Sequence, residues 1–376
     1  MICGHGGNIY ELAQRLGCAP IDIIDMSSNV NPLGPMTGLV RELQTRLDVI
    51  TTLPEVGADG IARLFAQHYG VDHRRVLAGN GTTQLIHTIP MALNSRNVLI
   101  VGPTYADYAD ACAMFAVRHE FLLTDELHRF RADVQTIAHG AKGFDTVFIC
   151  NPNNPTGSLI PAADLQWLFQ RLPDTIFIVD ESYMPFVVSE AKDSVLARGF
   201  PNVIVLHSLS KIFRIPGLRI GFLVGHENLT YKIKRFRLPW NVNSLAHVAV
   251  AYLMTHRQAV RSFIEESRAF LDTEKRYFKD GLSQVPGMTL FPSETSFILI
   301  KLPDALRAGT VCGRLAQEKL LIRDGSNFIG LGDHFIRVSL KTRACNQMVI
   351  HRLTALCGPS RGLEDPPCPV ALGKTA

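Results

Sequence analysis

Short apolar runs alternate with amphipathic stretches through the middle of the sequence, from about residue 76 to residue 224. Runs rich in valine and isoleucine predict buried strands, and the stretches between them predict helices. The strands that we expect lie at residues 76–78, 97–101, 146–150, 175–179, 203–205 and 220–224. Because strands that alternate with helices form a mostly parallel sheet, the pattern predicts an α/β fold.

The pattern changes after Asn243. Residues 245–271 have helical periodicity that continues past Tyr277, as one long helix or two joined helices. Three later apolar runs, at residues 290–300, 320–323 and 335–338, predict the strands of a smaller α+β domain. Residues 358–376 are rich in proline and glycine, which predicts a loose tail.

The composition limits the kinds of binding partner and the cellular compartment that we expect for this protein. A net charge of +4 with 19% charged residues is too mild to indicate a nucleic-acid partner. The eight cysteines contain no Cys-x-x-Cys pair, which is typical of a reduced, cytoplasmic protein. We expect no signal peptide and no membrane span, because no apolar run is long enough. We also expect no metal, since Cys3, His5, Cys357 and Cys368 match no usual zinc spacing.

Polar residues recur where the expected strands end: Tyr105, Asn154, Asp180, Ser208 and Lys211. In parallel α/β sheets, ligands bind at the carboxyl ends of the strands. Each residue also has an ordinary alternative role, such as core packing for the tyrosine, an Asx turn for the asparagine or a surface loop for the lysine. The recurrence indicates a ligand site more strongly than any single residue does.

The chemistry of two of these residues suggests the ligand. Lys211 lies between two expected strands, where burial is costly unless the amine has a task, and Schiff-base formation with an aldehyde cofactor is one that fits. Asp180 follows an apolar strand directly, so this nearly buried carboxylate should pair with a cation. A protonated ring nitrogen would be a suitable cation.

Other residues indicate anion sites. A helix expected to begin near Thr82, after Gly79-Asn-Gly81, offers backbone amides to a phosphate, although a plainly capped helix has the same pattern. Ser208 and Arg219 flank Lys211 at a spacing that suits a phosphate anchor.

Two further arginines, Arg323 and Arg337, lie inside expected strands between apolar neighbours. Arginines in such places face an anion or form a structural salt bridge, and both roles remain open.

An ordered set of motifs resembles the fold-type I pyridoxal-phosphate (PLP) enzymes and, within them, the histidinol-phosphate aminotransferase group. The motifs are Gly79-Asn-Gly81, Pro103-Thr-Tyr105, Asn151-Pro-Asn-Asn-Pro-Thr-Gly157, Asp180-Glu-Ser-Tyr183, Ser208-x-x-Lys211 and Gly217-Leu-Arg219. The resemblance implies a large domain with a mostly parallel sheet, a small domain made from both chain ends, and a homodimer with shared active sites. We place the large domain at residues 30–245 and the small one at residues 1–29 and 246–357.

The resemblance assigns roles around the cofactor ring. Lys211 would hold PLP as a Schiff base, and Asp180 would pair with the pyridinium nitrogen. Asn154 and Tyr183 would hydrogen-bond the ring 3'-oxygen. Tyr105 would stack on the ring.

The resemblance also assigns residues to the cofactor phosphate. The backbone amides of Gly81 and Thr82 would hold it, together with Ser208 and Arg219. One departure concerns Leu53-Pro54, where the family usually has Tyr-Pro. That tyrosine reaches across the dimer to the phosphate and a leucine cannot, so either one partner is missing or another group replaces it.

A narrower resemblance is to the threonine-phosphate decarboxylases of cobalamin biosynthesis, which make (R)-1-amino-2-propanol phosphate. It is carried by His5-Gly-Gly-Asn8, Ser28-Asn-Val-Asn-Pro-Leu-Gly34, Pro239-Trp-Asn-Val-Asn243 and Ile322-Arg-Asp-Gly-Ser-Asn-Phe328. In that family the opening histidine and the first asparagine of the Asn-x-Asn loop contact substrate, which implies the same for His5 and Asn29.

Our hypothesis for the reaction is that Arg323 and Arg337, with His5 and Asn29, hold the substrate's phosphate. The carboxylate is then left unclamped and out of the ring plane, so that the bond to it breaks. Lys211 would return a proton to Cα. The alternatives are a histidinol-phosphate aminotransferase, a serine-phosphate decarboxylase, which differs by one methyl group, and a non-catalytic PLP sensor.

Overall fold

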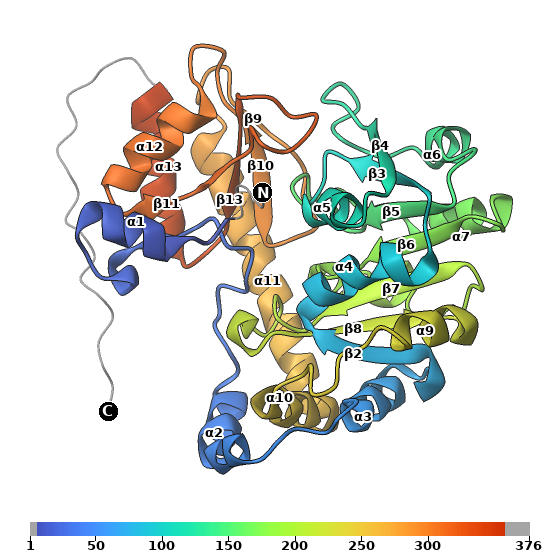
Figure 1. Ribbon diagram of the computed structural model, residues 1–376. Helices are drawn as coiled ribbons and strands as arrows, with labels where there is room; N and C mark the ends of the chain where they lie inside the picture. Colours follow the sequence, from blue (N-terminus) through green and yellow to red (C-terminus); the bar gives the residue numbers. More distant parts are fainter. Residues whose placement is uncertain (1–5, 358–376) are drawn as a thin grey trace.

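The computed structural model describes residues 6–357, and its largest element is a seven-stranded sheet (Figure 1). From one edge to the other, the order is β2 (Val76–Asn80), β8 (Ile220–Gly225), β7 (Val203–Ser208), β6 (Ile176–Asp180), β5 (Thr146–Cys150), β3 (Asn97–Gly102) and β4 (Arg118–Leu123). The strand β8 runs antiparallel to the other six, and all pairs that do not include β8 are parallel. The expectation of a mostly parallel α/β sheet is therefore confirmed, whereas the sequence analysis missed β4.

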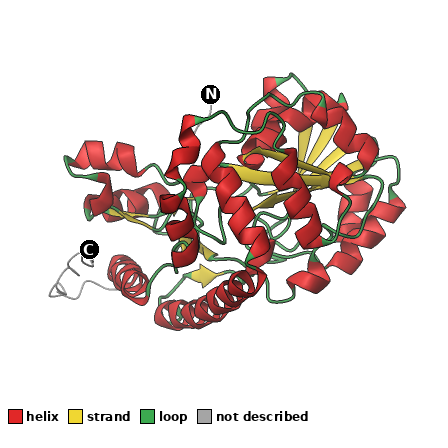
Figure 2. Ribbon diagram, turned by 90° about the horizontal axis from the view of Figure 1, so that it is seen from below, coloured by secondary structure: helices red, strands yellow, loops and turns green. Residues whose placement is uncertain are grey.

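Helices cover both faces of this sheet (Figure 2). On one face, apolar side chains of α4 (Gly81–Leu93), α5 (Asp107–Met114) and α9 (Glu227–Lys234) pack on alternate strand residues such as Ile178 and Ile204. On the other, α3 (Asp59–Tyr69), α6 (Val134–Gly140), α7 (Ala162–Arg171) and α10 (Ser244–Thr255) pack on Val179 and Val205. Burial on both faces explains why the central strands are continuous apolar runs.

A second region contains two smaller sheets. The larger of these is antiparallel, in the order β12 (Arg323–Asp324), β13 (Phe335–Ser339), β10 (Phe297–Lys301) and β9 (Thr289–Leu290). The other pairs β1 (Ile24–Asp25) in parallel with β11 (Leu320–Leu321). Two expected strands are thus each divided, at 290–300 and at 320–323.

Both ends of the described chain meet in this second region. Figure 1 shows α1 (Ile9–Leu16) beside α12 (Ala308–Gln317) and α13 (Arg343–Cys357). The helix α11 (Arg257–Leu282) runs from α10 towards the small antiparallel sheet. The helical stretch expected after Asn243 is therefore two helices, which meet at His256. The domain boundaries that we placed near residues 30 and 245 stay a prediction.

The remaining elements are short. They are α2 (Thr37–Thr45), α8 (Glu190–Asp193) and the 3-10 helices η1 (Pro20–Asp22), η2 (Leu47–Thr51), η3 (His73–Arg75), η4 (Met184–Phe186) and η5 (Pro216–Leu218). Within residues 6–357, no helix combines the length and apolarity that a bilayer crossing requires.

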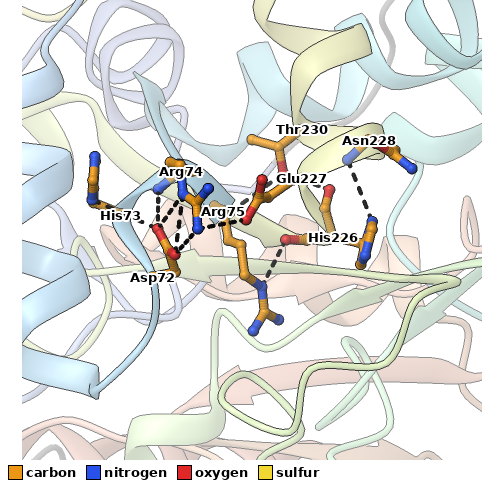
Figure 3. A network of polar contacts seen from close by, with 9 residues as sticks. Asp72, His73, Arg74, Arg75, His226, Glu227, Asn228 and Thr230 are labelled. Carbon is orange, nitrogen blue, oxygen red and sulfur yellow. Dashed lines mark hydrogen bonds and ion pairs between the residues drawn. The ribbon is translucent and has the colours of Figure 1, made fainter.

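A polar network ties the amino end of β2 to the start of α9 (Figure 3). Arg74 pairs with Asp72 at 2.6 Å and with Glu227 at 3.0 Å, and Arg75 Nε donates to the carbonyl oxygen of Gly225 at 3.1 Å. Exposed ion pairs of this kind contribute about 0–1 kcal/mol each. The network lies at the end of β2 opposite Asn80, so it does not take part in the site described below.

Candidate active site

The carboxyl ends of the central strands surround a cavity of about 80 Å³, which we call the inner cavity. Its lining includes all nine residues that the sequence analysis assigned to the cofactor: Gly81, Thr82, Tyr105, Asn154, Asp180, Tyr183, Ser208, Lys211 and Arg219. Strand pairing places them together, because Asp180 ends β6 beside β7, and Ser208 ends β7 beside β8. Their individual roles stay predictions.

One end of the inner cavity is built to accept an anion. The helix α4 begins at Gly81, whose φ is 72°, and the side chain of Asn80 makes no capping hydrogen bond there. A Cβ atom on Gly81 would lie 2.6 Å from an Nη atom of Arg219, so the guanidinium lies directly against the helix start. A Cβ atom on Gly221 would lie 2.5 Å from the backbone nitrogen of Thr82. Only glycines permit this close approach, which leaves amides and a guanidinium together as a phosphate site requires.

The carboxylate of Asp180 also lines the inner cavity and is buried at the end of β6. It accepts hydrogen bonds from the Tyr108 hydroxyl and the Ser182 backbone N–H, both at 2.9 Å. Burial raises the pKa of Asp180, while these hydrogen bonds and the charge of Lys211 oppose the rise. A cation in the inner cavity would favour the ionised form further.

Tyr108 is a site residue that the sequence analysis missed. It lines the inner cavity and its ring stacks on Phe148 at 5.0 Å between centroids. The available signal was its position three residues after Tyr105, just beyond the Pro103-Thr-Tyr105 motif.

Lys211 is the one lysine among the described residues that line the inner cavity. Burial, followed by the charges of Arg337 and Arg219, lowers the pKa of Lys211 to about 8, and Asp180 opposes this effect. An amine with such a pKa is partly neutral near pH 7, which is the form that attacks an aldehyde.

A series of hydrogen bonds links Tyr183 to the second region. The Asn29 amide donates to the Tyr183 hydroxyl oxygen at 3.1 Å, and the Ser339 hydroxyl donates to Asn29 Oδ1 at 2.6 Å. Burial raises the pKa of Tyr183 to about 12, with the nearby charge of Arg337 opposing. The hydroxyl therefore stays protonated and can donate to a ring oxygen.

A second cavity, of about 450 Å³, adjoins the first, and we call it the outer cavity. The two share Tyr105, Asn154, Tyr183 and Lys211. The rest of the outer cavity is lined by residues from several parts of the chain: Gly6, Asp25, residues 27–30, Ala106, Arg214, Pro216, Arg323, Asn327, Phe328 and Arg337.

Arg323 and Arg337 are directly opposite each other on β12 and β13. Arg337 is buried, donates to the carbonyl oxygen of Ser27 at 2.7 Å and to the Asn154 side-chain oxygen, and lies 5.3 Å from the centre of the Phe297 ring. Its Nε has no hydrogen-bond partner among the described residues. Burial lowers the pKa of Arg337 to about 10 and also lowers that of Arg323.

The partners of Arg323 are likewise uncharged. It donates to Asn327 Oδ1 at 2.7 Å and lies over the ring of Phe328. Within residues 6–357, neither Arg323 nor Arg337 lies within 4.0 Å of a carboxylate oxygen. This arrangement favours the anion-binding role over the structural salt bridge.

His5 falls outside the described residues. Leu53 is 75% exposed and lines neither the inner nor the outer cavity.

Comparison with known proteins identifies a family and several relatives. The model of the family "Aminotransferase class I and II" matches residues 21–353. A threonine-phosphate decarboxylase from Salmonella typhimurium is 31% identical, over 93% of this chain and 95% of its own length. The adenosylcobalamin biosynthesis bifunctional protein CobDQ from Leptospira interrogans is 31% identical, over 92% of this chain but only 40% of its own length.

Aminotransferases are also relatives. A histidinol-phosphate aminotransferase from Moorella thermoacetica is 31% identical, over 93% of this chain and 88% of its own length.

Solved structures share the fold. The L-threonine-O-3-phosphate decarboxylase from Porphyromonas gingivalis superimposes with a TM-score of 0.76, at 29% identity, over 88% of this chain and 98% of that one. A histidinol-phosphate aminotransferase from Sinorhizobium meliloti in complex with pyridoxal-5'-phosphate superimposes with a TM-score of 0.82 at 18% identity, over 95% of each chain.

Proposed function

The chain belongs to the aminotransferase class I and II family, and from that membership we propose that it is a PLP-dependent decarboxylase of L-threonine O-3-phosphate. The products would be (R)-1-amino-2-propanol phosphate and carbon dioxide, in cobalamin biosynthesis. The observation that carries the proposal is the outer cavity, in which two arginines without carboxylate partners face the same space as Lys211. Such a space suits a small substrate with a phosphate group.

The residues of the inner cavity fit pyridoxal phosphate at each of its polar groups. Lys211 Nζ would hold the aldehyde, Asp180 the ring nitrogen, and Asn154 with Tyr183 the ring oxygen. Tyr105 would cover the ring. When bound, the cofactor supplies an electron sink for the charge that develops at the substrate's Cα.

The start of α4 and the residues beside it would form the phosphate end of the site. The amides of Gly81 and Thr82, the hydroxyl of Ser208 and the guanidinium of Arg219 would hold the cofactor phosphate. Leu53 leaves this group without the tyrosine that the family usually provides from the partner subunit, and Arg219 against the helix start supplies the strongest remaining contact.

The outer cavity would decide which bond breaks. Arg323 and Arg337, with Asn29 and His5, would hold the substrate's phosphate and so fix the substrate's orientation. The carboxylate would then be left unclamped, so that the bond joining it to Cα would be the one to break. Binding energy from a remote group is thereby used to orient the reacting bond.

Lys211 has a second task in this scheme. Once carbon dioxide has left, Cα needs a proton. Lys211, whose amine lines both cavities, would donate it. With a pKa of about 8, its ammonium form is abundant at neutral pH and gives up a proton readily.

We further propose a cytoplasmic homodimer. Its large domain would comprise residues 30–245, and its small domain residues 1–29 and 246–357.

The test is incubation of the PLP-loaded protein with L-threonine phosphate, with carbon dioxide measured and the amine product identified by mass. Release of one carbon dioxide per amino-propanol phosphate is the expected result. Histidinol phosphate with 2-oxoglutarate, and L-serine phosphate, are tested in parallel. Transamination of histidinol phosphate without carbon dioxide release from either amino-acid phosphate would replace this proposal with the aminotransferase function.

A further inference from the structure

The segment that follows Lys211 contains two residues with left-handed backbone, and both are arginines. The φ angles are 50° at Arg214 and 51° at Arg219. This conformation is unfavourable for a residue other than glycine. Backbone strain of this kind concentrates at ligand sites, where the surrounding structure maintains it.

Each of the two arginines lines a different cavity. Arg219 lines the inner cavity, where it lies against the start of α4, and Arg214 lines the outer one. The sequence analysis assigned Arg219 to the cofactor phosphate, but it gave Arg214 no role. The same left-handed backbone conformation therefore occurs at Arg219, which is assigned to the cofactor, and at Arg214, whose role has still to be explained.

The contacts of Arg214 hold it at the outer cavity without neutralising it. One Nη donates to the carbonyl oxygen of Pro32 at 3.2 Å, which ties the side chain to the loop that carries Asn29. A Cβ atom on Gly34 would lie 3.8 Å from the same nitrogen. No carboxylate within residues 6–357 forms an ion pair with Arg214. Its remaining donors are available to a ligand.

The charge of the outer cavity calls for more than one anionic group. Four cationic side chains line it, namely Lys211, Arg214, Arg323 and Arg337. The one carboxylate in the lining is that of Asp25, and its Oδ1 already accepts from Ser27 and Ser28. An excess of positive charge in a partly enclosed space attracts a ligand that carries both a carboxylate and a phosphate.

The position of Arg214 distinguishes between these two groups. Arg337 hydrogen-bonds Asn154, and it is Arg337 and Arg219 whose charges lower the pKa of Lys211. Arg214 instead donates to the carbonyl oxygen of Pro32, on the loop that carries Asn29, a residue that the proposed function assigns to the substrate's phosphate. In an amino-acid phosphate the carboxylate is attached to the reacting carbon, whereas the phosphorus is three bonds away.

We propose that Arg214, which lines the outer cavity together with Arg323 and Arg337, also holds the phosphate of the substrate. The inference rests on the proposed function, which it deepens by adding a third arginine to the substrate site. The left-handed backbone at Arg214 and the hydrogen bond to Pro32 orient its side chain before the substrate binds.

Three ligands separate the possible roles of Arg214. (R)-1-amino-2-propanol phosphate has a phosphate and no carboxylate, L-threonine has a carboxylate and no phosphate, and L-threonine phosphate has both. Dissociation constants of the first two for the PLP-loaded protein are measured by calorimetry, and KM and kcat are measured for the third. In Arg214→Ala we expect affinity for the phosphorylated amine to fall about tenfold, KM for threonine phosphate to rise by a similar factor, and L-threonine binding to stay unchanged.

Two further variants control for the backbone. Arg214→Gly relieves the left-handed strain, so it should lose the same affinity as Arg214→Ala while its melting temperature equals or exceeds that of the wild type. Arg214→Lys keeps the charge but not the two-pronged geometry, so it should recover part of the affinity. A fall in melting temperature with unchanged dissociation constants in all three variants would make Arg214 a structural residue and overturn the proposal.

The remaining outcomes are equally decisive. Weaker binding of L-threonine with unchanged binding of the phosphorylated amine would assign Arg214 to the carboxylate. If the wild type turns over threonine phosphate and Arg214→Ala behaves identically, only this inference fails. If the wild type neither binds nor converts threonine phosphate, the proposed function fails, and inorganic phosphate becomes the probe. Weaker phosphate binding in Arg214→Ala than in the wild type would then support an anion role, and equal binding would overturn it.

Discussion

The inner and outer cavities share four residues but are built in different ways. The inner cavity forms at the strand ends of one continuous sheet, with a volume of about 80 Å³. Its lining residues come from consecutive strand–helix units between Gly81 and Arg219. The outer cavity, of about 450 Å³, is closed by the N-terminal segment and by the small antiparallel sheet, which lie far apart in the sequence.

This difference separates the chemistry from the choice of substrate. The inner cavity presents groups for a cofactor, which aminotransferases and decarboxylases of this family would use alike. The outer cavity presents arginines that bind only neutral oxygens and aromatic rings in the described part of the chain, so their charge remains for a substrate. Relatives with both activities at 31% identity are consistent with a common inner cavity and a variable outer one.

The sharpest way to test the inner cavity is Asp180→Asn. The amide keeps the shape of the carboxylate but cannot stabilise a protonated ring nitrogen, so we expect kcat for carbon dioxide release to fall on the order of 10²–10³-fold at saturating PLP. The matched control is Glu181→Gln, at the next position. Burial raises the pKa of Glu181 to about 8, and its oxygens accept from Ser194 and Val195 outside the inner cavity. That variant should retain its turnover, and full activity in Asp180→Asn would contradict the assigned role.

The outer cavity is tested by comparing Arg337→Ala with Arg323→Ala. Arg337 is buried and joins Ser27 to Asn154, so its removal takes away an anion anchor and leaves two acceptors unpaired. A charged hydrogen bond contributes about 1.5–3 kcal/mol, which predicts a loss in kcat/KM of roughly 10–150-fold. Arg323 is more exposed, so its loss should be smaller. Unchanged kcat/KM in both variants would remove the anchoring role, and steady-state kinetics on threonine phosphate decide it.

The shared residue Lys211 connects the two cavities through its pKa. Raising the pH removes a proton from the amine and creates the nucleophile, so capture of PLP by the apoprotein should accelerate with pH up to about 8 and then level off. From the neutral fractions, the rate should rise about fivefold between pH 7 and pH 8. For a lysine with the ordinary pKa of about 10.4, the rate of capture would continue to rise until about that pH. Stopped-flow absorbance at several pH values measures this.

A variant tests the cause of that pKa. The charge of Arg337 lowers the pKa of Lys211, so in Arg337→Ala the pH at which the rate levels off should move upward. A rate that keeps rising beyond pH 9.5 in the wild type would show that Lys211 is not perturbed.

The sequence was informative about the inner cavity for a physical reason. In a parallel sheet each strand ends at the same edge, so residues such as Asp180 and Ser208, placed directly after apolar runs, must lie near one another. Helix starts and glycine turns are likewise local features, which is why Gly81 and Thr82 could be placed. Tyr108 was missed because a tyrosine in an amphipathic helix looks like a core residue.

The outer cavity depends on contacts that no local pattern records. The strands β11 and β12 have two residues each, and they belong to different sheets although they are neighbours in sequence. Their periodicity is too short to read, so a single strand was expected over 320–323. The arginines at 323 and 337 were identified as candidates, but their direct pairing across two strands follows only from the register. The role of Arg214 depends on a backbone angle that the sequence does not reveal.

The smallest effect tests the link between the cavities. Ser339 lies on β13 two residues after Arg337, and its hydroxyl holds Asn29, which in turn donates to Tyr183. Ser339→Ala removes one neutral hydrogen bond, worth about 1 kcal/mol, and lets the Asn29 amide turn away from the tyrosine.

We therefore expect kcat/KM for threonine phosphate to fall two- to fivefold, with a similar loss in affinity for PLP, since Asn29 contacts Tyr183, which lines both cavities. Ser296→Ala is the matched control. Ser296 is equally buried and lies beside β10, the strand that pairs with β13, but its hydroxyl has no hydrogen-bond partner among the described residues. Its loss should leave kinetics and cofactor affinity unchanged. If Ser339→Ala behaves like Ser296→Ala, the second region positions substrate through its arginines alone, and the hydrogen bonds to Tyr183 are only structural.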